Sequence, residues 1–345
     1  MIIYNIYYMD YYGKYIKYKK KYLELSNNKM HSSLNELKSN DTIELINNQM
    51  YGGSNKIKSN DTLKLIPKKS VSKNYIKLEF PNINVSQCEY SEGPVGLTFI
   101  KFNKGAKVHM EIRGGWPGYI NCLSTNEKQI ISGINIAGGS LLGLESTTGL
   151  TIESLKNNNY TNFEGYNGAI IYSNNLNNNK IYPDKDLGRF ACNQNDDKLF
   201  NGQVGAGLSA SHGQGWSYKK IGKIKILALC VNNALGAVYK NDKPIHYPHN
   251  AKKNFMDKIE LNKNTTIIIL ITNLDLDNDE LKQMNQQINV SVGESIRPFN
   301  TLTDGDILYT CSTGELKNKF DMIKNIKFFD ICSQVLKKAI LQSVD

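Results

Sequence analysis

The alternation of apolar and polar residues predicts a body of layered strands and helices that begins near Lys73. Segments 96–102 and 107–115 alternate in the way that paired strands do. Residues 129–155 predict a strand, a glycine-rich turn and a helix, and residues 168–174 predict another short strand. The first half of the body is therefore expected to be a sheet with at least one helix packed on it.

The second half of the body repeats this mixture. Strands are predicted over 222–236, 265–273 and 304–314, and the middle one is almost uniformly apolar, as expected for a strand buried on both faces. Helical spacing is found around "LGRFACNQ", at the start of 276–296 and over 328–344. Strands and helices mix without strict βαβ alternation, which favours layered α/β sheets over a doubly wound fold.

Residues 1–72 differ from the body and predict an extension with little core of its own. They contain twelve Lys and six Asp or Glu, so they contribute +6 of the net charge of +10. "KSNDTIELI" at 38–46 recurs as "KSNDTLKLI" at 58–66, which is too few copies for a solenoid. Residues 1–25 interleave Tyr and Lys and resemble leaders on proteins of giant DNA viruses. A solvated tail is favoured there over weak contact with RNA or an anionic membrane.

The composition predicts a soluble chain, and no cofactor is expected. Apolar residues make up 40% of the 345 residues, and no run approaches the roughly 18 apolar residues of a membrane helix. The start of the chain lacks the features of a signal peptide, so we expect a cytoplasmic protein, with virion association as a further possibility. The six cysteines are scattered without a CxxC pair and are expected to be reduced. His246 and His249 have no third ligand nearby in the sequence, and we expect no metal site.

A glycine-rich segment, "GGSLLG" at 138–143, precedes the first predicted helix. The backbone amides of Gly138, Gly139 and Ser140 could bind a substrate or an anion at the start of that helix. Close packing of strand against helix explains the glycines equally well. The segment lacks the lysine of a P-loop, and the GxSxG motif of hydrolases is absent from the chain.

The junction Asn264–Thr265 stands directly before the apolar strand, in "NKNTTIIILITN". If the chain is cut there, Thr265 supplies both a hydroxyl nucleophile and an α-amine that accepts its proton. That chemistry requires a threonine at the edge of a rigid strand, as the sequence provides. A strand cap explains the hydroxyls as well, and the Asn-x-Thr glycosylation reading is disfavoured without a secretory signal.

A second pair, Asn300–Thr301, is a rival cleavage site in "RPFNTLTDGD". Asp304 and Asp306 follow it at a spacing of two, which places two side chains on one face of a strand. They could orient an ammonium or a threonine hydroxyl. A plain surface turn is the competing interpretation.

Seven fragments in order resemble the P1 family of aminopeptidases and amidohydrolases, of the S58 type, which includes D-aminopeptidase/esterases and endo-type nylon-oligomer hydrolases. They are "RGGWPG", "GGSLLGLESTTGL", "YPDKDLGRFAC", "GQVGAG", "VNNALG", "NTTIIILITN" and "IRP" with "TDGD", between about Val95 and Gly314. The resemblance implies an N-terminal-nucleophile-like αββα sandwich. It also implies a precursor that cuts itself into 73–264 (or 1–264) and 265–345, which selects Asn264–Thr265 over Asn300–Thr301.

The resemblance further implies the roles of individual residues. Thr265 would be the nucleophile, and Asp304 and Asp306 would hold its amine and hydroxyl. Asn233 would donate to the oxyanion, with Tyr172 assisting. The implied substrate is a small peptide or an amide oligomer, and the implied assembly is a homotetramer.

One departure from the family concerns a lysine between "VGAG" and "VNA". Alignment on the glycines puts His212 at that position, with Lys219 and Lys220 as alternatives, and a histidine could transfer a proton there.

Two functions follow for the chain. The first is a self-processing N-terminal-threonine amidohydrolase; the second is a catalytically impaired relative that serves as a binding or virion-associated protein.

Overall fold

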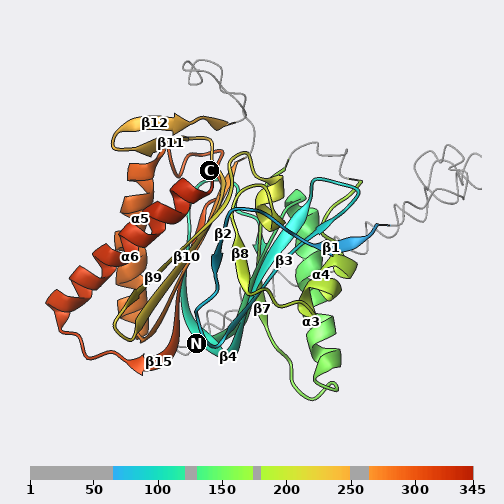
Figure 1. Ribbon diagram of the computed structural model, residues 1–345, viewed down its shortest axis with the longest axis horizontal. Coiled ribbons are helices and arrows are strands. Elements are labelled where there is room, and N and C mark those ends of the chain that lie inside the picture. Colours follow the sequence, from blue (N-terminus) through green and yellow to red (C-terminus); the bar gives the residue numbers. More distant parts are fainter. Residues whose placement is uncertain (1–64, 121–129, 174–179, 249–263, 345) are drawn as a thin grey trace, which may run out of the picture. The chain divides into compact units, whose positions relative to one another are not determined.

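The computed structural model describes residues 65–120, 130–173, 180–248 and 264–344 (Figure 1). The chain divides into two units, 1–64 and Leu65–Asp345, and the first lies outside the described residues. Strand β1 (Pro67–Lys69) pairs with β3 (Ile83–Tyr90). The folded body therefore begins before Lys73, because this strand adds to the edge of the first sheet.

The long strand β4 (Gly96–Ile112) joins the two layers of one continuous sheet, the first sheet on the side of β3 and the second sheet on the side of β15. Its residues 96–102 pair with β3, its residues 97–107 pair with β6 (Ile130–Ala137), and its last six residues pair with β15 (Ile307–Lys317). The prediction of two separate strands over 96–102 and 107–115 was wrong. Gly105, at φ +74°, lies where the register with β6 shifts between Lys101 and Ala106, so the chain is irregular there without reversing.

Strand β13 (Thr265–Asp275) lies at the centre of the second sheet, parallel to β15 and antiparallel to β10 (Ile224–Asn233). Ile267, Ile269 and Ile271 face the core between the sheets, and the alternate side chains face a helical layer. The expectation that this strand is buried on both faces is confirmed, and it explains why nearly every position is apolar.

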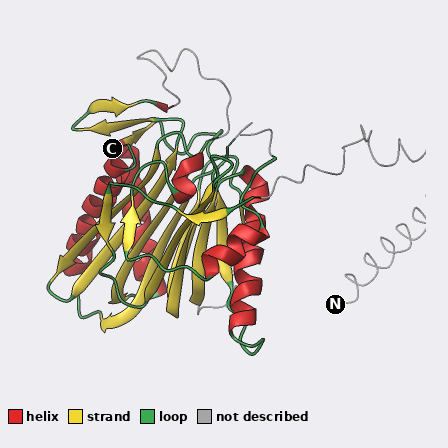
Figure 2. Ribbon diagram, turned by 45° about the vertical axis from the view of Figure 1, so that its right-hand side comes forward, coloured by secondary structure: helices red, strands yellow, loops and turns green. Residues whose placement is uncertain are grey.

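Helices cover the outer faces of the two sheets, as Figure 2 shows. Helices α3 (Glu145–Asn157) and α4 (Lys185–Cys192) pack on the first sheet. Helices α5 (Asn278–Ser295) and α6 (Met322–Gln342) pack on the second. One apolar cluster lies between the two sheets, and one further cluster lies between each sheet and the helices that cover it. The predicted αββα sandwich is therefore confirmed.

The remaining elements extend these sheets or lie around them. They are β2 (Tyr75–Lys77), β5 (Tyr119–Ile120), the 3-10 helix η1 (Ser140–Leu144), β7 (Tyr166–Ile170), β8 (Lys198–Phe200), the 3-10 helix η3 (Gly205–Ser209), β9 (Gly213–Ile221), β11 (Ala237–Lys240), β12 (Lys243–His246) and β14 (Ile296–Arg297). The five cysteines in the described part of the chain are free thiols, and burial raises the pKa of Cys192 to about 11. Cys122 lies outside the described residues.

Candidate active site

The predicted site residues of the second sheet meet at one edge of it. Because β13 runs parallel to β15 and antiparallel to β10, the start of β13 lies beside the turn before β15 and the end of β10. The register places Asn233 directly opposite Thr265, and Asn264 forms an isolated bridge with Asp304. The topology thus brings together residues that are separated by up to 73 positions in the sequence.

The Thr265 hydroxyl lies against the carbonyl of the peptide bond that precedes it. Its Oγ1 donates to the Asn264 carbonyl oxygen at 2.6 Å, and the side chain is fully buried. The backbone N–H of Gly305 donates to the same carbonyl oxygen at 2.9 Å. The N–H of Tyr172 donates to Thr265 Oγ1 at 3.4 Å. The hydroxyl and the carbonyl are therefore held together by fixed backbone donors.

The two aspartates are buried in the turn before β15. Asp306 accepts from the N–H of Thr266 at 2.6 Å and from the N–H of Asn300 at 3.2 Å. Burial and the nearby Asp304 carboxylate raise the pKa of Asp306 well above its usual value, and hydrogen bonds from Thr266 and Asn300 offset only part of this rise. A raised pKa favours the protonated form of this carboxyl group.

Asp304 accepts from the Thr301 hydroxyl at 2.6 Å, from the Thr301 N–H at 3.0 Å and from the Leu235 N–H at 3.3 Å. The prediction that Asp304 and Asp306 share a strand face was wrong, because β15 begins only at Ile307. The Thr301 hydroxyl already donates to the Asp304 carboxylate, so this threonine forms part of the turn.

Asn233 is held at both ends of its amide. Its Nδ2 donates to the Tyr172 carbonyl at 2.8 Å, and its Oδ1 accepts from the Ser211 N–H at 2.8 Å. The Ser211 hydroxyl is in turn 2.9 Å from Nδ1 of His212, whose buried ring lies 4.9 Å from that of His246. His212 thus reaches the Thr265 neighbourhood through Ser211 and Asn233.

Lys219 and Lys220 are excluded from this neighbourhood. They pair with Ile226 and Lys225 at the other end of β10, and both are exposed. Asn233 lies seven positions after Ile226 in β10, which corresponds to about 24 Å along a strand. Of the three candidates for the family lysine position, only His212 lies near Thr265.

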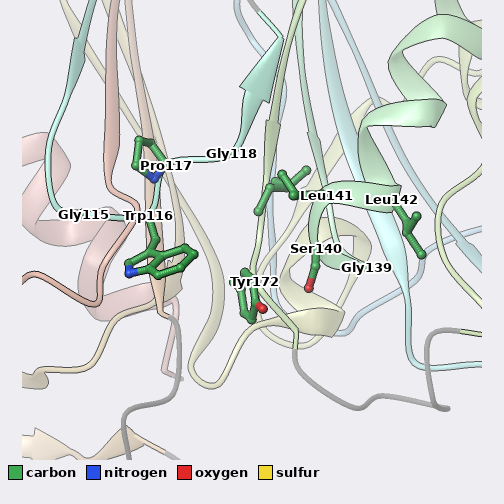
Figure 3. A pocket seen from close by; sticks show the side chains of 10 residues that line it. Gly115, Trp116, Pro117, Gly118, Gly139, Ser140, Leu141, Leu142 and Tyr172 are labelled. Atoms are coloured by element: carbon green, nitrogen blue, oxygen red, sulfur yellow. The ribbon is translucent and has the colours of Figure 1, made fainter. Parts of the chain in front are cut away.

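Beside this site lies a pocket of about 370 Å³ (Figure 3). It is lined by Gly115, Trp116, Pro117, Gly118, Gly139, Ser140, Leu141, Leu142, Ile170 and Tyr172. Of the predicted substrate-binding residues, Gly139 and Ser140 line it. Gly138 does not line the pocket. It packs closely against Ser209, so that a Cβ atom added to Gly138 would lie 1.9 Å from Ser209 Oγ.

The expected anion cradle is not formed by this glycine segment. The N–H of Gly139 donates to Ser173 Oγ, and the N–H of Ser140 donates to the Ile171 carbonyl. Both amides are therefore engaged within the protein. Trp116 and Gly305, which the sequence did not single out, belong to the site; both lie within fragments that carried the family resemblance, "RGGWPG" and "TDGD".

Within the described residues, no group of three or more His, Cys, Asp or Glu side chains is placed to hold a metal ion. His249 lies outside the described residues. None of the described helices is both long and apolar enough to span a membrane.

Comparison with known proteins places the chain among enzymes. The model of peptidase family S58 matches residues 80–344. The 6-aminohexanoate-oligomer endohydrolase of Kocuria sp. (strain KY2) is 29% identical over 283 residues, covering 73% of this chain and 78% of the relative. The enzyme of the same name from Paenarthrobacter ureafaciens is 29% identical over 282 residues, covering 72% and 78%.

Solved structures share the fold at low sequence identity. A Burkholderia sp. β-aminopeptidase has a TM-score of 0.58 and 12% identity, with 76% of this chain and 84% of that chain covered. The L-aminopeptidase D-Ala-esterase/amidase of Ochrobactrum anthropi, described as a variant of the Ntn hydrolase fold, has a TM-score of 0.57 and 14% identity, with 80% and 82% covered. This chain belongs to peptidase family S58 and is an amide-bond hydrolase with the Ntn hydrolase fold.

Proposed function

We propose that the chain cuts itself between Asn264 and Thr265 and then hydrolyses amides through an acyl-Thr265 intermediate. The observation that carries this proposal is the 2.6 Å hydrogen bond from the Thr265 hydroxyl to the Asn264 carbonyl oxygen. The nucleophile is thus already in contact with the carbonyl group that it would attack. Burial of the junction holds the hydroxyl beside the carbonyl group and so favours an intramolecular reaction.

The cut proceeds as a shift of the acyl group from nitrogen to oxygen. Oγ1 of Thr265 bonds to the carbonyl carbon of Asn264, the C–N bond breaks, and the hydroxyl proton ends on the new amine. Water then hydrolyses the ester, which leaves a carboxylate on Asn264 and a free amine on Thr265. The N–H of Gly305, 2.9 Å from the carbonyl oxygen, stabilises the negative charge that develops there.

In the mature enzyme the freed amine of Thr265 acts as the base for its own hydroxyl. An α-amine has a pKa of roughly 7.7–8.0, so it is partly neutral near physiological pH. Asn233 supplies an amide donor to the oxyanion, and its bonds to Tyr172 and Ser211 fix its orientation. Asp304 and Asp306 position the start of β13, through the bridge from Asp304 to Asn264 and the bond from the Thr266 N–H to Asp306.

His212 acts as a positioning residue in this scheme. Its ring is bonded to Ser211, which holds the Asn233 amide from behind. Small peptides or amide oligomers are the proposed substrates, in keeping with the named activity of the endohydrolase relatives.

The test is a comparison of the parent protein with Thr265→Ala and Thr265→Ser. The parent should hydrolyse 6-aminohexanoate oligomers or aminoacyl amides and give an acyl adduct on the fragment that begins at Thr265, detectable by mass spectrometry. Thr265→Ala should remain one chain without hydrolysis, and Thr265→Ser should retain both reactions. Full hydrolysis by Thr265→Ala would contradict the proposal.

Three further expectations stay predictions. The homotetramer can be tested by sedimentation of the purified chain. Nucleic-acid binding through residues 1–25 and virion association concern a segment outside the described residues. Salt-dependent RNA affinity that disappears on removal of residues 1–72 would support the former.

A further inference from the structure

We propose that the pocket beside Thr265 is a subsite for an uncharged, apolar group of the substrate, held against Trp116. The inference deepens the proposed function, on which it rests. It concerns the chemical class of the group next to the scissile amide.

The walls of the pocket are apolar and aromatic. Pro117, Leu141, Leu142 and Ile170 contribute aliphatic surface, and Trp116 and Tyr172 contribute rings. Figure 3 shows these two rings on neighbouring segments, with Ser140 and Leu141 on the wall beyond Tyr172. All ten described lining residues are uncharged.

A polar group of the pocket wall already forms hydrogen bonds within the protein. The Ser140 hydroxyl donates to the Ser173 carbonyl and accepts from the Ser173 N–H. A ligand ammonium entering here would leave water without meeting a carboxylate among the described lining residues, which disfavours its binding. An alkyl chain or a ring would bury apolar surface against Trp116 and the leucines, which favours its binding.

Two walls of the pocket also contact the reaction site. The N–H of Trp116 donates to the Asp304 carbonyl at 3.0 Å, and a Cβ atom on Gly305 would lie 2.3 Å from the Trp116 carbonyl oxygen. Tyr172 donates its N–H to Thr265 Oγ1. A group in the pocket is therefore next to the nucleophile, where it can position a scissile amide.

Trp116 is also an optical probe of the pocket. The chain contains two tryptophans, and the other, Trp216, is fully buried in the core between the sheets, whereas Trp116 is 54% exposed. A ligand that covers Trp116 should shift its emission to shorter wavelength, and Trp116→Phe should abolish that response.

The experiment titrates the full-length Thr265→Ala chain with heptanamide and with 6-aminohexanamide. These amides differ only in a terminal methyl or ammonium group. Heptanamide should bind at least tenfold more tightly and produce the emission shift. Trp116→Ala, followed by calorimetry, should weaken its binding.

Leu141→Asp provides a charge-reversal test at a position that is 62% exposed. It should weaken heptanamide binding, strengthen 6-aminohexanamide binding and so reverse the preference. Val290→Asp, on a 69% exposed position of α5, is the matched control and should leave the preference unchanged.

Absence of saturable heptanamide binding would overturn the proposal. Equal or tighter binding of 6-aminohexanamide would also overturn it, and would indicate an ammonium held over the Trp116 ring. The binding arm needs no reaction at Thr265. A parent chain that stays uncut but prefers heptanamide would contradict self-cleavage and support the subsite. A chain that is cut but does not prefer heptanamide would support self-cleavage and contradict the subsite.

Discussion

Replacement of Asn233 by alanine tests how much of the site depends on one buried amide. The change removes the 2.8 Å bonds to the Tyr172 carbonyl and the Ser211 N–H. The residue is 3% exposed, so water does not readily replace either bond. A buried polar group left without a partner costs roughly 1–3 kcal/mol, and two such groups are created here.

The catalytic effect adds to this loss of stability. Removal of one oxyanion donor lowers the rate of the chemical step roughly 10²–10³-fold. We therefore expect Asn233→Ala to lower the free energy of unfolding, measured by urea titration, and to slow amide hydrolysis of the folded protein by that factor.

The adjacent residue supplies the matched control. Asn232 is fully buried, accepts from the Ala234 N–H and donates to Ser343 Oγ, and so lies toward α6. Asn232→Ala should also lower stability, but it should change the hydrolysis rate less than about tenfold, equivalent to about 1.4 kcal/mol of barrier. If both variants lose stability and hydrolyse at similar rates, Asn233 is structural and the oxyanion role is refuted.

The remaining predictions concern the turn before β15 and the far end of β9. Because the pKa of Asp306 is raised by folding, its protonated form stabilises the fold, and this contribution is lost as pH rises from about 3.9 through the raised value. Asp306→Asn should therefore flatten the fall in melting temperature over this range, and an unchanged slope would contradict the assignment. Gly305→Ala should slow self-cleavage, followed by gel analysis, because its Cβ would meet the Trp116 carbonyl at 2.3 Å; Gly293→Ala, with open space around it, should cleave normally and gain about 0.5–1 kcal/mol of stability. The Lys219→Ala and Lys220→Ala variants should cleave themselves at the rate of the parent chain. Slower self-cleavage in either variant would make that lysine a candidate for the position of the family lysine again.

The sequence predicted the layers and the order of the site-bearing segments, for physical reasons. The uniformly apolar run after Thr265 predicts a strand covered on both faces. The lack of strict βαβ alternation favours layered sheets over a doubly wound fold, and the family resemblance implies the αββα sandwich. The family fragments then located Thr265, Asn233 and the aspartates in the chain. Their proximity follows from the parallel and antiparallel pairing of three strands, which the pattern alone does not show.

Other features depend on contacts that periodicity does not encode. The glycine in "FNKGAK" is compatible with either a turn between two strands or a bulge within one strand. Pairing with β6 and β15 on both sides of this glycine makes β4 one continuous strand. A spacing of two residues suggested a strand face for Asp304 and Asp306, whereas hydrogen bonds from Thr301 and Thr266 hold them in a turn. The place of Trp116 depends on its backbone hydrogen bond to Asp304, which lies 188 positions later in the chain.

The most direct test of self-cleavage is intact mass and N-terminal sequencing of the purified full-length protein. The account predicts a C-terminal fragment that begins Thr-Thr-Ile and runs from Thr265 to Asp345. A fragment that begins at Thr301, or a chain that stays whole under conditions where it hydrolyses amides, would contradict it.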